Sequence, residues 1–175
     1  MILKLKRTPG IYLAGFMGSG KTTIGGLLAY ELGWTFVDLD QDIEAAEGAA
    51  IHQVFATRGE EHFRKVETAA LQKRIRTIQT GRPMVVALGG GAFAQAENFE
   101  LLQNNGVSVW LDCPLALART RAALNELRPL ARDAARFEHL YFSRRASYQQ
   151  ADFRVEITGD DPKPVISAIL ALPIF

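Results

Sequence analysis

GFMGSGKT, at residues 15–22, matches the pattern G-x-x-x-x-G-K-T without a mismatch. Glycines allow such a loop to turn its backbone N–H groups inward, toward phosphate oxygens. In this pattern the lysine, here Lys21, reaches the β- and γ-phosphates, and the hydroxyl of Thr22 binds Mg²⁺. A helix that begins near Lys21 directs the positive end of its dipole at the same anion. We therefore predict a triphosphate site formed by Gly18, Ser19, Gly20, Lys21, Thr22 and Thr23.

The sequence on both sides of this loop predicts a strand before it and a helix after it. Residues 11–14 are a short apolar run, and from Thr22 to Leu32 the apolar residues recur at helical spacing until Gly33. A glycine-rich turn in some other α/β protein is the alternative, and this flanking order makes it much weaker.

The same alternation continues along the chain. Further β-type runs alternate with helical segments, the last of which covers about 164–171; the runs lie at 35–38, 84–88, 107–111 and 153–157. Alternating strands and helices predict an α/β fold in which helices cover both faces of a parallel sheet. In such folds ligands bind at the carboxyl ends of the strands.

Composition indicates one ordinary globular domain spanning residues 1–175, with 22% charged and 48% hydrophobic residues. Twenty basic and nineteen acidic side chains leave a net charge of +1, which argues against a nucleic-acid surface. No apolar stretch approaches the roughly twenty residues of a membrane helix, and the N-terminus shows no secretion signal. The single cysteine, Cys113, fits a reducing cytoplasm. Balanced charge and the absence of a heptad pattern favour a monomer.

Two acidic residues stand at the end of the second predicted strand. Asp38 and Asp40 are two positions apart, so in an extended chain both carboxylates face the same way. Beside a phosphate loop, Asp38 can orient Mg²⁺ through water while Asp40 accepts a hydrogen bond from an attacking hydroxyl. The alternative is that Asp40 only caps a helix beginning near Gln41. The phosphate loop in front of the pair favours the functional interpretation.

Two further segments suggest an acceptor site. Arg64 and Glu67 are neighbours on one helix face, so Glu67 can hold a guanidinium fork ready for a substrate carboxylate. Taken alone, this pair would more simply be a surface ion pair. Gly89, Gly90 and Gly91 directly follow a buried-type strand and allow close approach of the backbone to a ligand.

An arginine-rich region lies between the predicted helices near 115–124 and 137–149. Arg128-Pro129-Leu130 falls in its middle, where periodicity is weak, and predicts a mobile lid at about 123–137. A cationic loop that closes over phosphates stabilises the transferring charge and expels water. Most of the other arginines fit a solvated helix face.

Taken in order, the phosphate loop, Asp-x-Asp, Phe-Arg-x-x-Glu, Gly-Gly-Gly and Arg-Pro-Leu resemble the shikimate kinases, of the nucleoside monophosphate kinase-like group. The resemblance covers nearly the whole chain. It implies a three-layer α/β/α P-loop NTPase fold with a five-stranded parallel sheet and a mobile lid. The activity it implies is Mg²⁺-dependent transfer of the γ-phosphate of ATP to the 3-hydroxyl of shikimate, which gives shikimate 3-phosphate and ADP.

The resemblance also implies roles for single residues. Lys21, Asp40 and Arg128 are expected to be catalytic, with Mg²⁺ held by Thr22 and, through water, by Asp38. Further nucleotide contacts are expected from Arg121 and Pro162. The expected shikimate-binding residues are Asp40, Arg64, Gly89, Gly90, Gly91 and Arg145.

The chain departs from the family pattern in two places. Ala131 follows Leu130 where a second leucine is usual, and Ala146-Ser147-Tyr148 stands where Pro-x-Tyr is usual. The second departure leaves Arg144 as the alternative to Arg145. The histidines at 52, 62 and 139 have no ligand spacing and are interpreted as structural or surface residues.

Three other functions remain open from the residues alone. A gluconate-type kinase would share the loop but has no evident need for Arg64 with the three glycines. A nucleotide kinase would need a base-reading site that the sequence does not show. A regulatory module without turnover would not need Lys21, Asp40 and Arg128 together.

Overall fold

Five parallel strands form the central sheet of the computed structural model, which describes residues 10–124 and 133–174. The strands are β1 (Gly10–Ala14), β2 (Thr35–Asp38), β3 (Met84–Ala87), β4 (Val107–Asp112) and β5 (Phe153–Glu156). Their order across the sheet is β2-β3-β1-β4-β5. All five predicted strands are confirmed, each to within one residue at either end.

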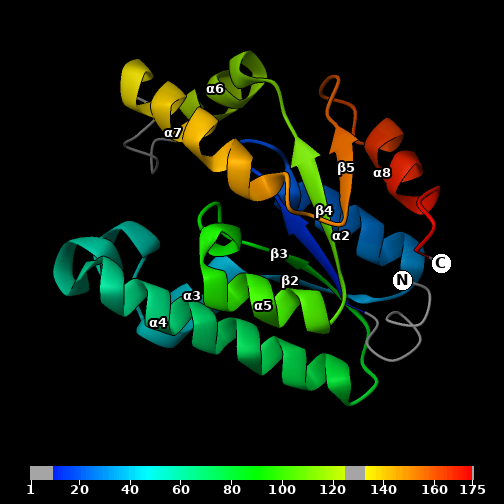
Figure 1. Ribbon diagram of the computed structural model, residues 1–175, viewed down its shortest axis with the longest axis horizontal. Helices are drawn as coiled ribbons and strands as arrows, with labels where there is room; N and C mark the ends of the chain where they lie inside the picture. Colours follow the sequence, from blue (N-terminus) through cyan, green and yellow to red (C-terminus); the bar gives the residue numbers. More distant parts are fainter. Residues whose placement is uncertain (1–9, 125–132, 175) are drawn as a thin grey trace.

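Helices connect the strands as the alternating pattern predicts (Figure 1). They are α2 (Lys21–Leu32), α3 (Leu39–Glu47), α4 (Ile51–Gln79), α5 (Ala96–Asn104), α6 (Leu115–Ala123), α7 (Ala134–Tyr148) and α8 (Lys163–Leu170), with a short 3-10 helix η1 (Ala92–Ala94). The long α4 is broken at Gly59, whose backbone has φ 82° and ψ 169°. Within residues 10–124 and 133–174, no helix is long and apolar enough to cross a membrane.

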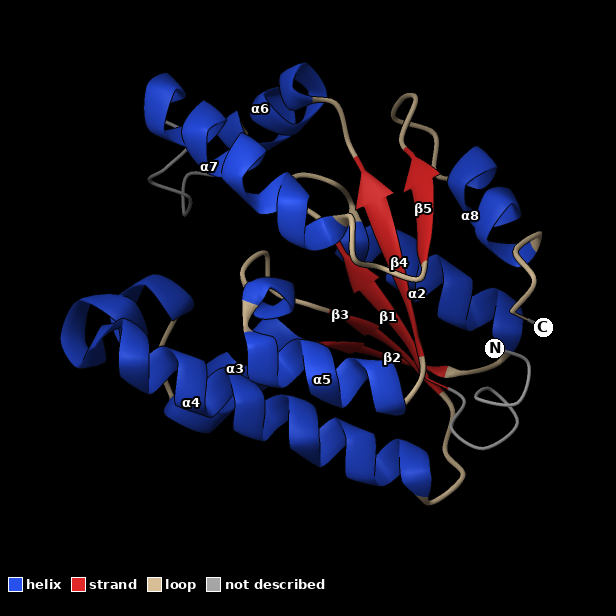
Figure 2. Cartoon of the chain, in the orientation of Figure 1, coloured by secondary structure: helices blue, strands red, loops and turns tan. Residues whose placement is uncertain are grey.

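The sheet lies between two groups of helices, as Figure 2 shows with the strands in red. On one face α2 packs on β2 and β3 and also contacts α8. On the other face α5 contacts β4, α4 contacts α5, and α7 contacts η1. The predicted three-layer α/β/α arrangement is therefore present.

The core lies on the three inner strands. Every residue of β1, β3 and β4 is buried, whereas the edge strands β2 and β5 are partly exposed. Inner strands of a parallel sheet carry nearly continuous apolar runs because helices cover both of their faces. The polar residues that follow these strands gather at one edge of the sheet, at the carboxyl ends.

Candidate functional site

A cavity of about 1100 Å³ opens at the carboxyl ends of the strands. Residues after β1, β2, β3 and β5 line it together with residues from α4, α6 and α7. Most of the residues predicted for the site are among the lining: Gly18, Ser19, Gly20, Lys21, Thr22, Thr23, Asp38, Asp40, Arg64, Gly89, Gly90, Gly91, Arg121 and Pro162. Segments far apart in the sequence therefore meet in one hollow.

The phosphate loop has the backbone that its glycines predict. Gly20 precedes α2 with φ 89° and ψ 19°, a left-handed conformation that residues other than glycine rarely adopt. The ammonium of Lys21 donates to the carbonyl oxygens of Gly15 at 2.6 Å and Phe16 at 3.1 Å. The buried hydroxyl of Ser19 has no hydrogen-bond partner within the described part of the chain. The loop thus holds polar groups at the start of a helix, where an anion is favoured.

Asp38 is tied to the phosphate loop. Its Oδ2 accepts from the Thr22 hydroxyl at 2.7 Å, and its Oδ1 accepts from the backbone N–H of Asp40 at 3.0 Å. A hydroxyl and a carboxylate are oxygen ligands of the kind that Mg²⁺ prefers, so this pair fits the predicted ion. Over residues 10–124 and 133–174, no group of three or more His, Cys, Asp or Glu is placed to hold a metal.

The geometric reason given for Asp38 and Asp40 is wrong, although both residues line the cavity. The prediction assumed an extended chain, but β2 ends at Asp38 and α3 begins at Leu39. Asp38 is the N-cap of α3, so the alternative in which Asp40 caps a helix near Gln41 is wrong as well. Asp40 enters the cavity from the first turn of α3 instead of from a strand.

The Arg64–Glu67 pair is not a surface ion pair. Arg64 Nη1 donates to Glu67 Oε1 at 2.8 Å, and the Glu67 side chain is only 1% exposed. Burial raises the pKa of Glu67 above its ordinary value, and the nearby Arg64 guanidinium acts in the opposite direction. The buried carboxylate therefore fixes a guanidinium that itself lines the cavity.

The three glycines bring the charged groups of different helices together. A Cβ atom at Gly89 would lie 2.8 Å from Asp40 Oδ1. A Cβ atom at Gly91 would lie 2.6 Å from Arg64 Nη2 and 3.1 Å from Arg144 Nη1. Contacts under 3.0 Å leave no room for a side chain, so the turn after β3 is the meeting point of α3, α4 and α7.

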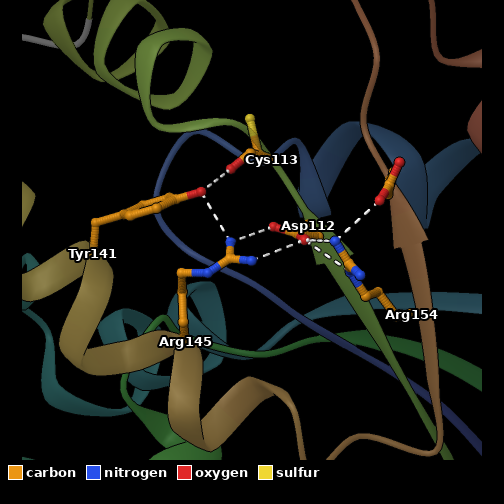
Figure 3. A network of polar contacts seen from close by, with 6 residues as sticks. Asp112, Cys113, Tyr141, Arg145 and Arg154 are labelled. Atoms are coloured by element: carbon orange, nitrogen blue, oxygen red, sulfur yellow. Dashed lines mark hydrogen bonds and ion pairs between the residues drawn. The ribbon is translucent and has the colours of Figure 1, made fainter.

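The structure places Arg144, and not Arg145, at the large cavity. Successive helical residues point about 100° apart, and Arg145 faces a separate hollow of about 150 Å³ beside Trp110. There it donates to both carboxylate oxygens of Asp112 (Figure 3). The expected role of Arg145 in binding shikimate does not match this placement.

A signal in the sequence could have identified Arg144. Tyr148 lies four residues later, on the same face of a helix. Its hydroxyl donates to the carbonyl oxygen of Gly90 at 2.5 Å and also hydrogen-bonds with Arg144. A tyrosine in register with Arg144 therefore marks the face of α7 that meets the glycine turn.

Arg121 joins the two loops expected to hold the nucleotide. Its guanidinium donates to the carbonyl oxygens of Gly18 at 3.1 Å and Gly159 at 3.0 Å, and to Asp160 Oδ1 at 3.2 Å. Pro162, after these residues, also lines the cavity. Arg128 and most of the predicted lid, with Leu130 and Ala131, lie outside the described residues.

Several lining residues were not anticipated from the sequence. Phe55 and Phe63 stack with their ring centroids 4.4 Å apart, and both line the cavity. His52, interpreted as a structural or surface residue, is exposed but lies at the cavity as well. The break in α4 at Gly59, which lies between Phe55 and Phe63, was not predicted from the sequence.

A family model and individual relatives match this chain over most of its length, and all of them point to one family. The family model described as shikimate kinase matches residues 17–172. A shikimate kinase of Persephonella marina is 40% identical over 161 residues, which cover 91% of this chain and 96% of that protein. One of Synechococcus elongatus is 41% identical over 164 residues, covering 91% of this chain and 84% of the other.

Solved structures agree with the sequence comparison. The structure of shikimate kinase from Acinetobacter baumannii in complex with shikimate has a TM-score of 0.85 and 34% identity, and the match covers 97% of this chain and 95% of that one. The shikimate kinase of Aquifex aeolicus has a TM-score of 0.80 and 34% identity, with coverage of 92% and 94%.

Proposed function

The chain belongs to the shikimate kinase family, whose members transfer the γ-phosphate of ATP to the 3-hydroxyl of shikimate, and from this membership we propose which of its residues perform each part of the reaction. Phosphoryl transfer requires alignment of the reactants and neutralisation of charge more than covalent help from the protein. The two ends of the cavity supply these separately.

The nucleotide end binds and orients the triphosphate. We assign the phosphates to the backbone of residues 18–23, to the ammonium of Lys21 and to the unpartnered hydroxyl of Ser19. Thr22 would hold Mg²⁺ directly and Asp38 would do so through water. That ion, when bound, neutralises charge between the β- and γ-phosphates. Arg121, fixed between the loops at Gly18 and Gly159, forms one wall of the nucleotide site together with Pro162.

The acceptor end selects a small acid that carries hydroxyl groups. Asp40 lies beside Gly89 and would accept the hydrogen bond of the attacking hydroxyl, holding its oxygen in line with the phosphate. Arg64 and Arg144 both approach Gly91, where their guanidiniums form a site of the right charge and shape for a carboxylate. Arg144 takes the place that the family resemblance implied for Arg145.

The main support for this proposal is that charged side chains from three helices converge at the glycine turn. One carboxylate and two guanidiniums, carried by three helices, lie within contact distance of Gly89–Gly91 at the same cavity as the phosphate loop. A kinase for sugars or nucleosides without a carboxylate has no use for two arginines there.

We also propose that residues 1–175 act as one monomeric kinase domain in the cytoplasm. The support is the balanced charge and the single cysteine, Cys113. Cys113 is buried, and burial raises the pKa of its thiol, which makes the thiolate scarce. Sedimentation at micromolar concentration should give the mass of one chain, and a mass of two chains would contradict this part.

The test is ADP release with ATP and Mg²⁺ in the presence of shikimate, gluconate or a nucleoside monophosphate. We expect turnover with shikimate alone, and loss of turnover when the shikimate carboxylate is replaced by its carboxamide. Turnover with gluconate instead would show that the site accepts a different substrate. Tight ATP binding without turnover on any acceptor would indicate a regulatory module.

A further inference from the structure

A network of polar contacts surrounds Asp112, at the carboxyl end of β4 (Figure 3). The Asp112 side chain is 8% exposed. Its Oδ1 accepts from Arg145 Nη1 at 2.6 Å, and its Oδ2 accepts from Arg145 Nη2 at 3.2 Å and from Arg154 Nε at 2.8 Å. Two-point pairing of a guanidinium with a shielded carboxylate fixes direction as well as distance.

Arg145 ties α7 to the segment that ends β4. Its guanidinium lies 4.9 Å from the ring centroid of Trp110, and its Nη1 donates to the Tyr141 hydroxyl at 3.0 Å. That hydroxyl in turn donates to the carbonyl oxygen of Cys113 at 2.6 Å. Two successive turns of α7 are therefore fastened to residues 110–113 through side chains that do not line the large cavity.

The same helical turn also carries Arg144, which points about 100° away from Arg145. Its Nη1 would lie 3.4 Å from a Cβ atom at Gly90 and 3.1 Å from one at Gly91. A long side chain reaches a fixed point only if the helix that carries it cannot rotate, and a misplacement of about 1 Å can weaken a catalytic geometry on the order of a hundredfold. The rotation of α7 about its axis therefore decides where Arg144 points.

We propose that Arg145 is a positioning residue: its fork on Asp112 fixes the rotation of α7 so that Arg144 faces the glycine turn and meets the acceptor carboxylate. This role rests on the proposed function, in which Arg144 binds that carboxylate. It differs from direct binding because Arg145 belongs to the hollow beside Trp110 and does not line the large cavity. Removing it should weaken acceptor binding and leave nucleotide binding intact.

Arg154 provides a matched control. It pairs with the same Asp112 and lies over the same indole, 5.3 Å from the ring centroid. It is carried by β5, however, and its contacts with Asp112, Glu156 and Trp110 do not involve α7. Arg154→Gln therefore removes a similar ion pair without releasing the helix that holds Arg144.

The experiment is steady-state kinetics on the full chain with both substrates varied. Arg145→Gln should raise the shikimate KM about five- to tenfold, with kcat and the ATP KM within about twofold of wild type. Arg154→Gln should leave the shikimate KM within about twofold. A purely structural role predicts equal effects of the two variants, or a parallel loss in both KM values, and either result would overturn the proposal.

Three further variants distinguish the remaining outcomes. If Arg145→Gln does not fold, Arg145→Lys and Arg154→Lys replace the pair; the lysine at 145 keeps the charge but not the fork, so a two- to threefold rise in shikimate KM is expected for it alone. Equal KM values for both lysine variants would contradict the role.

Arg144→Gln distinguishes the positioning role of Arg145 from the proposed carboxylate clamp. If it leaves the shikimate KM unchanged, the proposed clamp is wrong, and if only Arg144→Gln acts, the clamp stands and the positioning role fails.

Discussion

The nucleotide end and the acceptor end of the cavity differ in how many parts of the chain supply their charged groups. At the nucleotide end, residues 15–23 are contiguous and their positions follow from one loop and the first turn of α2. At the acceptor end, Asp40, Arg64 and Arg144 come from α3, α4 and α7 and meet only at the turn after β3. The first site depends on local backbone geometry, and the second depends on how distant helices pack.

Substitutions at the two ends of the cavity should have different kinetic effects. Changes at the nucleotide end should lower turnover, because they remove the positive charge that stabilises the transferring phosphate. Changes in the packing of the acceptor end should mainly raise the shikimate KM, because the acceptor carboxylate is charged before and during the reaction. Three predictions test this division, and a fourth, at Asp40, tests the chemistry at the acceptor end.

The largest effect is expected from Lys21→Ala. Its ammonium lies inside the phosphate loop, and its loss should lower kcat about a hundredfold or more while the shikimate KM changes little. Steady-state assays of ADP release measure both. Lys65→Ala, which removes an exposed lysine paired with Glu61, is the control and should keep wild-type rates. A loss of less than about tenfold at Lys21 would contradict its assignment.

Asp40→Asn should come next, because it removes the carboxylate proposed to accept the hydrogen bond of the attacking hydroxyl but keeps the shape of the side chain. We expect kcat to fall about a hundredfold. Asp42→Asn, two residues along the same helix, is the control: Asp42 accepts the fork of Arg74 at 2.6 and 2.7 Å, so its loss should lower stability and spare kcat. If both variants retain wild-type kcat, Asp40 has no part in the chemistry.

Gly91→Ala should act through packing alone. The Gly91 backbone, with φ −101° and ψ −7°, is one that alanine can adopt, but its Cβ would lie 2.6 Å from Arg64 Nη2. The guanidinium must move, and the shikimate KM should rise about tenfold with the ATP KM unchanged. Gly26→Ala on α2, where the nearest atom would be 3.9 Å away, should change neither value. An unchanged shikimate KM in Gly91→Ala would show that the position of Arg64 does not matter.

The smallest effect is a pH dependence of acceptor binding. Because burial raises the pKa of Glu67, this carboxylate takes up a proton at a higher pH than an ordinary glutamate and then stops holding Arg64. The shikimate KM, measured at saturating ATP, should therefore rise about two- to fivefold between pH 7.5 and 5.5. Glu67→Gln should abolish most of this change, and a profile identical to wild type would exclude Glu67 as its source.

Stability should respond to the same proton in the opposite direction. A carboxyl whose pKa is raised in the folded protein stabilises it fully below the unfolded value of about 4.5, and this contribution is lost as the pH rises through the raised pKa. Acidification from pH 7.5 to 5.5 should therefore increase the contribution of Glu67 to folding stability while it weakens acceptor binding. Urea unfolding of wild type and Glu67→Gln at both pH values measures the first effect separately.

The contrast between the two ends also explains what the sequence could predict. The phosphate loop and the five strands are local patterns, and the structure confirms them nearly to the residue. The Arg64–Glu67 pair was predictable because both residues lie on one helix face. The choice between Arg144 and Arg145 depended on the rotation of α7, which Asp112 and Trp110, some thirty residues away, determine. The cap at Asp38 was missed because the chain was assumed to stay extended as far as Asp40, whereas α3 begins at Leu39, directly after the strand.

The most direct test of the central claim is the structure of the protein with a nucleotide and shikimate bound. We predict that the shikimate carboxylate lies between the guanidiniums of Arg64 and Arg144, with a ring hydroxyl at Asp40 and the ring over Gly89–Gly91. A carboxylate bound instead at Arg145 beside Trp110, or an acid lying away from the glycine turn, would contradict the account.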